Sequence, residues 1–335
     1  MICILSQSFL EPTTEAVMDW LRAWKVPYVR INGDDIDRSG GPQYSISNRG
    51  VKATLTIDGG SIDPNQIKVV WYRRWAYNNK YKKIEVYGDR PQQKKFNTQM
   101  FYQHLRSELQ TVSDFLFSML SSASWLGHPS NSSLNKLKVL KMASDLGLDI
   151  PDTLVTTDID DLREFIKKHG EVITKPASEV LLCMLDEWMQ TTYTTVVNEE
   201  FLNDFPWKGE FPSLFQERLK KKYEVRTFYL DGKCYSMAMF TQRLADTETD
   251  FRRYTYEDPT RTVPYRLPAR TEEAIRELMK AVKLDTGSID LVRTVDGRLV
   301  FLEINPIGQF GMVSVPCNYF LEREVARSLA NRLYE

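Results

Sequence analysis

The chain has 335 residues, of which 42% are hydrophobic and 27% are charged, proportions typical of soluble proteins with more than one domain. Its 44 Lys and Arg residues nearly balance 45 Asp and Glu residues, and a net charge of −1 argues against nucleic-acid binding over the whole surface. No apolar run reaches the roughly 20 residues of a membrane-spanning helix, and the N-terminus lacks the basic start of a signal peptide. The four cysteines have no close pair and no metal-ligand spacing. We therefore expect a cytoplasmic protein with unpaired thiols.

The N-terminal third has the pattern of strands alternating with helices. β-Branched and aromatic residues mark the expected strands, which are residues 2–5, 28–32, 52–57 and 68–75. Helical spacing is found over residues 14–24 and, with few breakers, over about residues 92–120. This alternation predicts an α/β domain that ends near Ser124.

The rest of the chain divides into two further segments. A turn-rich stretch precedes an amphipathic helix at residues 134–148, and the sequence then predicts strand, helix and strand up to Pro176. Sheet-forming residues dominate from about 214 to 241, and they are followed by two helices and a hairpin. These are a helix at 272–283, a hairpin at 288–304 and a closing helix at 320–333. The predicted domains are residues 1–124, 125–215 and 216–335.

The hairpin has an unusual distribution of charge. Asp296-Gly297 is a strong signal for a two-residue turn, in which Val295 would pair with Arg298. Counting back along both strands then sets Asp290 directly opposite Glu303. The β-carbons of such a pair lie about 4.5–5.5 Å apart on one face of the sheet.

Asn305 follows Glu303 by two residues and should therefore share its face. Two opposed carboxylates repel each other unless a cation lies between them, and carboxylate and amide oxygens suit Mg²⁺. The alternative is an exposed sheet face with scattered charges, and a β-bulge would change the pairing. The hairpin count alone leaves both interpretations open.

Two lysines and two glutamates add to this pattern. Lys136 begins the central helix and Lys175 ends a strand, although either lysine alone is more often a solvated surface charge. Glu217 ends an apolar strand, and Glu224 starts the next. The order Lys, Lys, Glu, Glu, Arg, Asp and Glu-x-Asn resembles the ATP-grasp superfamily over roughly residues 125–335. The stretches "EINP" and "DLGLDIP" resemble its branch related to ribosomal-protein glutamate ligases.

The resemblance implies a role for each matching residue and implies ATP and Mg²⁺ as cofactors. The lysines would hold the ATP phosphates, residues 216–219 would form the adenine hinge, and Glu224 would bind the ribose. The residues implied to bind ATP are Lys136, Lys175, Gln216, Glu217, Arg218, Leu219 and Glu224. Those implied to hold Mg²⁺ are Asp290, Glu303 and Asn305, and those implied to be catalytic are Arg226, Arg243 and Arg252. Arg226 and Arg243 would face the phosphate and the acyl phosphate, and Arg252 matches a further basic position of that branch. The implied fold is an N-terminal α/β pre-ATP-grasp domain with two subdomains that enclose ATP.

Stretches near both ends of the chain narrow the resemblance to one group of ATP-grasp enzymes. The stretches "ILSQSFLEPTTEAVMDWLRAWKVPYVRIN", "VVWYRRW" and "GQFGMVSVPCNYFLEREVA" are similar to ATP-grasp peptide maturases that make graspetides, also called omega-ester-containing peptides. Among these, the chain most resembles the maturases of the grasp-with-spasm systems, over nearly its whole length. This implies an enzyme that crosslinks acidic side chains of a ribosomal precursor peptide by ester or amide bonds. It also implies a homodimer.

Other interpretations remain open. A related ligase could act on small amino acids or on protein termini with the same nucleotide site. A catalytically silent nucleotide- or peptide-binding module is a third possibility, because "KPASEVLLCM" lacks the glycines of many ATP-grasp phosphate loops. The intact set of Asp290, Glu303 and Asn305 argues against that possibility.

Three smaller features have a functional and a structural explanation. "WYRRWAYNNKYKK" interleaves aromatic and basic residues, so Arg73 and Arg74 could contact an acidic peptide, a structural partner or, least favoured, nucleic acid. Lys220–Lys222 would form a solvated turn, which is the favoured interpretation, or would touch a nucleotide phosphate or a partner. Cys317 has no histidine nearby in the sequence and is expected to be a buried thiol rather than a nucleophile.

Overall fold

The computed structural model describes most of the chain. The described residues are 1–36, 41–57, 60–76, 98–178, 182–185, 188–191, 194–204, 211–240 and 260–335. They form two compact units, one of residues 1–130 with 320–335 and one of residues 131–319. The predicted boundaries after residues 124 and 215 stay a prediction. No described helix has the length and hydropathy that a membrane span requires.

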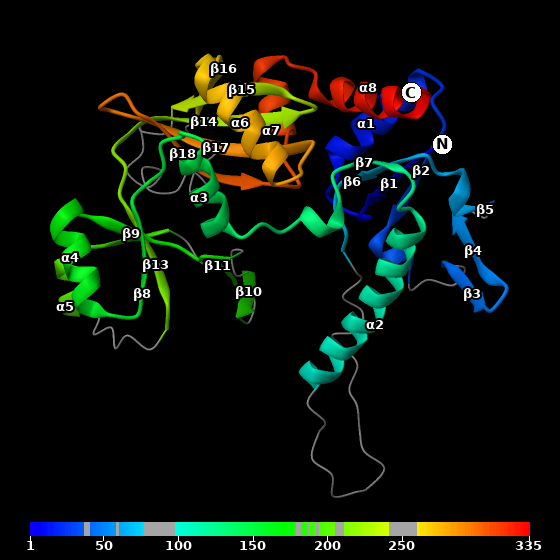
Figure 1. Cartoon of the computed structure of the whole chain (residues 1–335), viewed down its shortest axis with the longest axis horizontal. Helices are drawn as coiled ribbons and strands as arrows, with labels where there is room; N and C mark the ends of the chain where they lie inside the picture. Colours follow the sequence, from blue (N-terminus) through cyan, green and yellow to red (C-terminus); the bar gives the residue numbers. More distant parts are fainter. Residues whose placement is uncertain are drawn as a thin grey trace, which may run out of the picture. The chain divides into compact units, whose positions relative to one another are not determined.

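A parallel sheet lies at the centre of the first unit (Figure 1). Its strand order is β2 (Tyr28–Asn32), β1 (Ile2–Ser6), β6 (Val69–Tyr72) and β7 (Ser124–Leu126). Every residue of β1 is buried, as expected for a strand covered on both faces. The sequence analysis found three of these strands and missed β7, because three residues are too few to show a periodic pattern.

Helices cover both faces of this sheet. On one side α1 (Pro12–Ala23) packs against α8 (Leu321–Tyr334), and α8 also contacts β1 and β6. The C-terminal end of α2 (Thr98–Met119) packs on the other face, where Leu116 and Phe117 share a core with Leu5. The predicted start of this helix, residues 92–97, lies outside the described residues. A small antiparallel sheet completes the unit, with strands β3 (Gln43–Ser47), β4 (Gly50–Ile57) and β5 (Gly60–Ile62).

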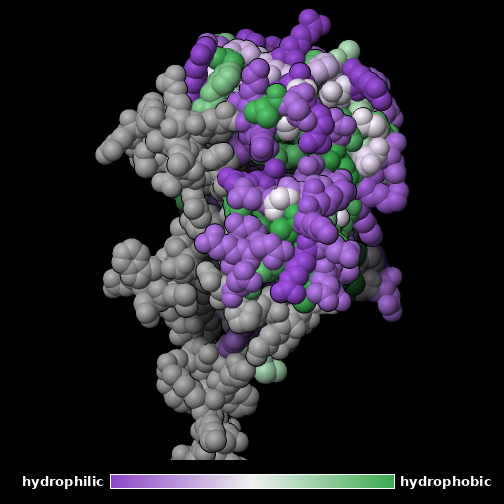
Figure 2. All heavy atoms as spheres, turned by 90° about the vertical axis from the view of Figure 1, so that its left-hand side faces the viewer, coloured by the Kyte–Doolittle hydropathy of each residue, from purple (hydrophilic) through white to green (hydrophobic). Residues whose placement is uncertain are grey.

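The second unit contains a four-stranded antiparallel sheet and its helices. The strand order is β12 (Thr195–Val197), β9 (Val172–Thr174), β13 (Ser213–Glu217) and β8 (Thr153–Thr156). The amphipathic helix α4 (Ile159–His169) buries Leu162 and Ile166 against it, and α5 (Glu199–Asp204) adds Leu202 to the same core. The hairpin of β10 (Leu182–Leu185) and β11 (Trp188–Thr191) was not predicted. Figure 2 turns the α4 and α5 side toward the viewer, and its coloured surface is mainly hydrophilic.

A five-stranded antiparallel sheet forms the other part of the second unit. Its strand order is β16 (Arg261–Tyr265), β15 (Lys233–Phe240), β14 (Lys221–Leu230), β17 (Thr286–Thr294) and β18 (Leu299–Asn305). One face carries Val225, Ile289 and Leu291, which share a core with residues of α3 (Lys136–Asp145) and α6 (Ala269–Ala281). Since neighbouring residues of a strand point to opposite faces, Glu224, Arg226 and Asp290 lie on the other face.

Several shorter elements connect these parts. They are the 3₁₀ turns η1 (Gly33–Asp35), η2 (Pro64–Gln66) and η4 (Pro129–Asn131) and the helix α7 (Gly311–Cys317). The sequence analysis predicted none of them, since each is shorter than the window in which a helical period becomes visible.

Candidate active site

Asp290 pairs with Glu303 across β17 and β18 as predicted, but the length of the turn and the register of the hairpin differ from the predicted ones. The turn has three residues, because Gly297 adopts a φ of 95° and Thr294 N donates to Arg298 O at 3.0 Å. The predicted pairing of Val295 with Arg298 is therefore wrong. The register shifts back by one residue at a β-bulge next to Asp290. The bulge thus compensates for the longer turn instead of disrupting the acidic pair.

Three charged residues form a row across neighbouring strands. Arg226 on β14 pairs with Asp290 on β17, which in turn pairs with Glu303 on β18. Arg226 Nε lies 3.5 Å from Asp290 Oδ1, and Lys136 Nζ, at the first residue of α3, lies 3.2 Å from Glu303 Oε2. Cations thus flank the two carboxylates at both ends of the row.

The row holds more negative charge than its burial favours. Burial raises the pKa of Asp290 to about 6, against the lowering effect of Arg226, and the Glu303 and Glu224 carboxylates raise it as well. A cation bound between Asp290 and Glu303 would remove this conflict. The residues therefore fit a hard metal ion such as Mg²⁺. The described residues contain no cluster of three His, Cys, Asp or Glu side chains suited to a metal, so such a site would need the Asn305 amide, phosphate or water.

Asn305 lies at the end of the same face. It pairs with Ser288, two residues from Asp290, and its Oδ1 accepts hydrogen bonds from the backbone N of Ile307 at 3.2 Å and of Gly308 at 3.3 Å. This turn leads the chain away from β18. Asn305 shares the face of the acidic pair, but its Oδ1 is engaged by these two backbone hydrogen bonds, and its role as a metal ligand stays a prediction.

The second lysine interacts electrostatically with the same carboxylates from another sheet. Lys175 directly follows β9, and burial lowers the pKa of its ammonium group. Glu303 raises this pKa, Lys136 lowers it and Asp290 raises it. Two lysines from distant parts of the sequence therefore both interact electrostatically with one acidic pair, which the order of residues alone could not predict.

The predicted hinge joins the two sheets of the second unit, since β13 ends at Glu217 and β14 begins at Lys221. Gln216 is buried, and its Nε2 donates to Thr153 Oγ1 at 2.9 Å. Arg218 forms an ion pair with Glu171. Glu217 Oε1 accepts from the backbone N of Asp152 at 3.3 Å, and Leu219 is half-buried. These hydrogen bonds and this ion pair fix the connection between the two strands. Because they engage the polar side chains, any contact with adenine would be made by backbone atoms.

Glu224 lies on the charged face, and Lys221 Nζ donates to its Oε1 at 2.7 Å. The sequence analysis left Lys220–Lys222 open between a solvated turn and a contact with the nucleotide or a partner. For Lys221 the solvated alternative is wrong, since only 12% of its side chain is exposed. This contact could not be predicted from the sequence, because the register of the strand depends on its tertiary pairing.

Two predicted arginines and part of the phosphate loop cannot be placed. Arg243 and Arg252 lie outside the described residues, as does Glu179, while Ala177 and Ser178 are exposed. The β10–β11 hairpin begins at the end of the stretch "KPASEVLLCM", which lacks the glycines of many ATP-grasp phosphate loops.

Arg73 and Arg74 lie in the first unit, where both bind one carboxylate. Arg73 Nε is 3.5 Å from Glu11 Oε2, and Arg74 Nε is 3.1 Å from Glu11 Oε1. Thr14 Oγ1 donates to the same carboxylate at 2.7 Å. Arg73 is only 3% exposed, and burial lowers its pKa to about 10 although Glu11 raises it, whereas Arg74 is 28% exposed. The sequence analysis missed Glu11, which showed no pattern beyond its place before Pro12.

Cys317 is buried, which confirms the expectation of a buried thiol, and burial raises the pKa of that thiol. Cys3 and Cys234 are also free thiols.

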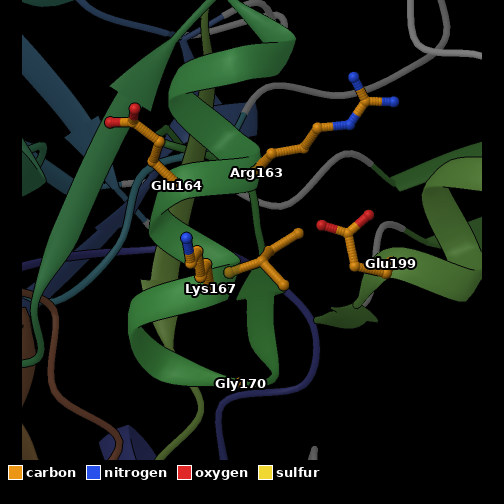
Figure 3. Close-up of a pocket in the computed structure, with 6 residues that line it drawn as sticks. Arg163, Glu164, Lys167, Gly170 and Glu199 are labelled. Atoms are coloured by element: carbon orange, nitrogen blue, oxygen red, sulfur yellow. The ribbon is translucent and has the colours of Figure 1, made fainter.

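An open hollow of about 470 Å³ lies between α4 and α5 (Figure 3). It is lined by Arg163, Glu164, Ile166, Lys167, Gly170 and Glu199. None of these is a predicted site residue, and the basic and acidic side chains are mixed. We do not assign the hollow to the active site.

Comparisons with known proteins identify the fold. No protein-family model matches the chain, and no curated protein matches it. Solved structures match it over nearly their whole length, and the chain has the mixed α/β ATP-grasp fold. A RiPP-associated ATP-grasp ligase from Chryseobacterium gregarium, in complex with ADP and a leader and core peptide, is 24% identical, with a TM-score of 0.82 over 99% of this chain and 96% of that one.

Two further structures show the same likeness. The macrocyclase MdnC from Microcystis aeruginosa MRC, bound with the precursor peptide MdnA, is 24% identical, with a TM-score of 0.78 over 99% of each chain. The ATP-grasp ligase PsnB, complexed with a phosphomimetic variant of its minimal precursor, Mg and ADP, is 17% identical, with a TM-score of 0.73 over 99% of this chain and 98% of that one.

Proposed function

We propose that this protein is an ATP-dependent, ADP-forming ligase that crosslinks side chains of a ribosomally made precursor peptide. The observation that carries the proposal is the arrangement of Arg226, Asp290 and Glu303 in one row, with Lys136 and Lys175 beside it. Cations around a pair of carboxylates are what phosphoryl transfer from a metal nucleotide needs.

The reaction needs no nucleophile from the enzyme. An oxygen of a peptide Glu or Asp carboxylate attacks the γ-phosphorus of ATP, the bond to the bridging β–γ oxygen breaks, and ADP leaves with its electron pair. A hydroxyl or amine of the same peptide then attacks the acyl carbon of the acyl phosphate. Phosphate leaves, the nucleophile loses its proton, and an ester or amide remains.

The chain's own residues would bind and orient the reactants. Lys136, Lys175 and Arg226 would neutralise charge on the phosphoryl oxygens, and the hinge at residues 216–219 and Glu224 would hold adenine and ribose. Asp290, Glu303 and Asn305 would hold Mg²⁺, which supplies charge neutralisation and alignment of the phosphates when bound. Arg243 would face the phosphate groups and Arg252 would add a further basic side chain, as the resemblance to ATP-grasp ligases implies.

The choice of a peptide substrate rests on two observations. The TM-scores to structures described as complexes with precursor peptides are 0.82 and 0.78, whereas that to D-alanyl-alanine synthetase A from Vibrio cholerae is 0.54. Arg74 is more exposed than Arg73 and offers positive charge to an acidic peptide, while Glu11 holds both guanidinium groups in place. The grasp-with-spasm assignment, the homodimer and the cytoplasmic location stay predictions.

Mass spectrometry tests the proposal directly. The protein would be incubated with ATP, Mg²⁺ and a peptide with an acidic core and Thr, Ser or Lys residues, encoded in a neighbouring reading frame. We expect the peptide to lose one water per crosslink, with one ADP and one phosphate formed each time. An unchanged peptide together with ATP turnover on free amino acids would favour the amino-acid ligase instead.

A further inference from the structure

The contact between Lys221 and Glu224 has an unexpected geometry. In a regular strand, residues three positions apart point to opposite faces of the sheet. Lys221 Nζ nevertheless lies 2.7 Å from Glu224 Oε1. Some departure from the regular strand must therefore bring the two side chains to one face.

A β-bulge provides that departure. Lys221 pairs with Thr294 of β17, but the next pair is Tyr223 with Arg293, so Lys222 is the extra residue. Thr294 shares its face with Asp290, four residues away, because side chains of a strand alternate. Lys221 is thereby turned to the charged face, and Lys222 is exposed to solvent. Bulges that redirect one side chain are found preferentially beside active sites.

The two paired side chains are largely buried. Lys221 is 12% exposed and Glu224 is 10% exposed. Removing two charges from water is costly, so a buried ion pair is weak evidence that the pair stabilises the fold. Its value is conformational, because one charged hydrogen bond fixes the rotamer of a carboxylate that faces the proposed nucleotide site.

We propose that Lys221 is a positioning residue for the nucleotide, acting through Glu224. Its ammonium group holds Oε1, so that Oε2 is presented to a hydroxyl of the ribose. This inference rests on the proposed function, since it deepens the role given to Glu224. Lys221 itself makes no contact with the reacting atoms.

Nucleotide binding to two matched variants tests the inference. Lys221→Met removes the ammonium group and keeps the length of the side chain, and Lys222→Met makes the same change at the exposed neighbour. Affinity would be measured by calorimetry with ATP and with 2′,3′-dideoxy-ATP, which lacks both ribose hydroxyls. We expect Lys221→Met to weaken ATP about tenfold, as for the loss of one charged hydrogen bond, and Lys222→Met to change it less than about twofold.

The deoxygenated nucleotide provides the decisive comparison. If Lys221 acts only through the ribose contact of Glu224, dideoxy-ATP binds equally to Lys221→Met and to the unaltered protein. Lys221→Arg should restore much of the ATP affinity, and Lys221→Gln serves if Lys221→Met does not fold. Equal ATP affinity of the Lys221 and Lys222 variants would overturn the inference, as would equal losses for ATP and dideoxy-ATP.

The same measurements separate this inference from the proposed function. If the unaltered protein binds ATP but the Lys221 variants behave as the Lys222 variant does, only the positioning role fails. If the unaltered protein binds neither nucleotide, the proposed function fails and the positioning role fails with it.

Discussion

Asp290 and Glu303 face each other across the β17–β18 ladder, and each carboxylate has a cation on its outer side. Arg226 Nε lies 3.5 Å from Asp290, and Lys136 Nζ lies 3.2 Å from Glu303. Two carboxylates in direct cross-strand register cost stability. Their presence on a sheet whose opposite face is a hydrophobic core indicates a functional constraint on this face.

Replacing Glu303 tests that constraint. Glu303→Gln should reduce ATP turnover at least about a hundredfold, since the variant would lose a charged ligand of the metal nucleotide. The Glu303 side chain is 36% exposed and its ion pair with Lys136 is partly solvated. The free energy of unfolding should therefore change by less than about 1 kcal/mol.

The two measurements are ADP release and chemical denaturation. Asp290→Asn is the companion variant, and it should abolish ATP turnover as well. Asp296→Asn, in the exposed turn of the same hairpin, is the matched control and should keep full turnover. Unimpaired ATP consumption in both site variants would refute the magnesium assignment.

The turn that sets this register depends on one glycine. Gly297 has a φ of 95°, a region that favours glycine over residues with a β-carbon. Gly297→Ala should lower the free energy of unfolding by about 1 kcal/mol, measured by urea denaturation. Gly297→Asn should cost less, because Asn tolerates positive φ better. Equal stability of the Ala variant and the unaltered protein would contradict the assigned turn.

The acidic pair shows how far sequence reasoning can reach. Alternation in the two strands and the Asp296-Gly297 signal were enough to place Asp290 opposite Glu303. They could not reveal that a three-residue turn and a bulge compensate for each other, because both turn lengths are compatible with Asp-Gly. The correct pairing was therefore obtained through an incorrect intermediate step.

Other parts of the site could not be predicted from the sequence, for a physical reason. The electrostatic interaction of Lys175 with Glu303 depends on how two sheets pack, and no local pattern encodes that packing. Lys221 looked like one of three solvated lysines, and only the bulge on β14 distinguishes it from Lys222. Glu11 was missed because its partners, Arg73 and Arg74, follow another strand of the parallel sheet.

Cys3 should report on the stability of the first unit. It lies on the central strand β1 with no exposed surface, and burial raises the pKa of its thiol from 9.0 to about 12. Between these two values the native state holds a proton that the unfolded state releases. Stability from this group should therefore fall as the pH rises above about 9, and be unaffected below that.

A variant that retains only Cys3 allows the measurement, with Cys183, Cys234 and Cys317 replaced by Ala. At pH 8 a thiol reagent should modify Cys3 only as fast as the protein unfolds. Urea should accelerate the modification in parallel with the loss of circular dichroism. Rapid modification of the folded protein would show that β1 is not covered on both faces.

Variants of Arg73 and Arg74 should distinguish a loss of stability from a loss of peptide binding. Arg73 and Glu11 have side chains that are 3% and 1% exposed, so Arg73→Met leaves a buried carboxylate with one partner fewer. We expect this variant to lose about 3 kcal/mol of unfolding free energy. Arg74 is 28% exposed, and Arg74→Gln should instead raise the KM for an acidic precursor peptide several-fold while ATP affinity is unchanged. Denaturation and peptide titration distinguish the two effects, and an Arg74 variant with unchanged peptide KM would remove this residue from the substrate site.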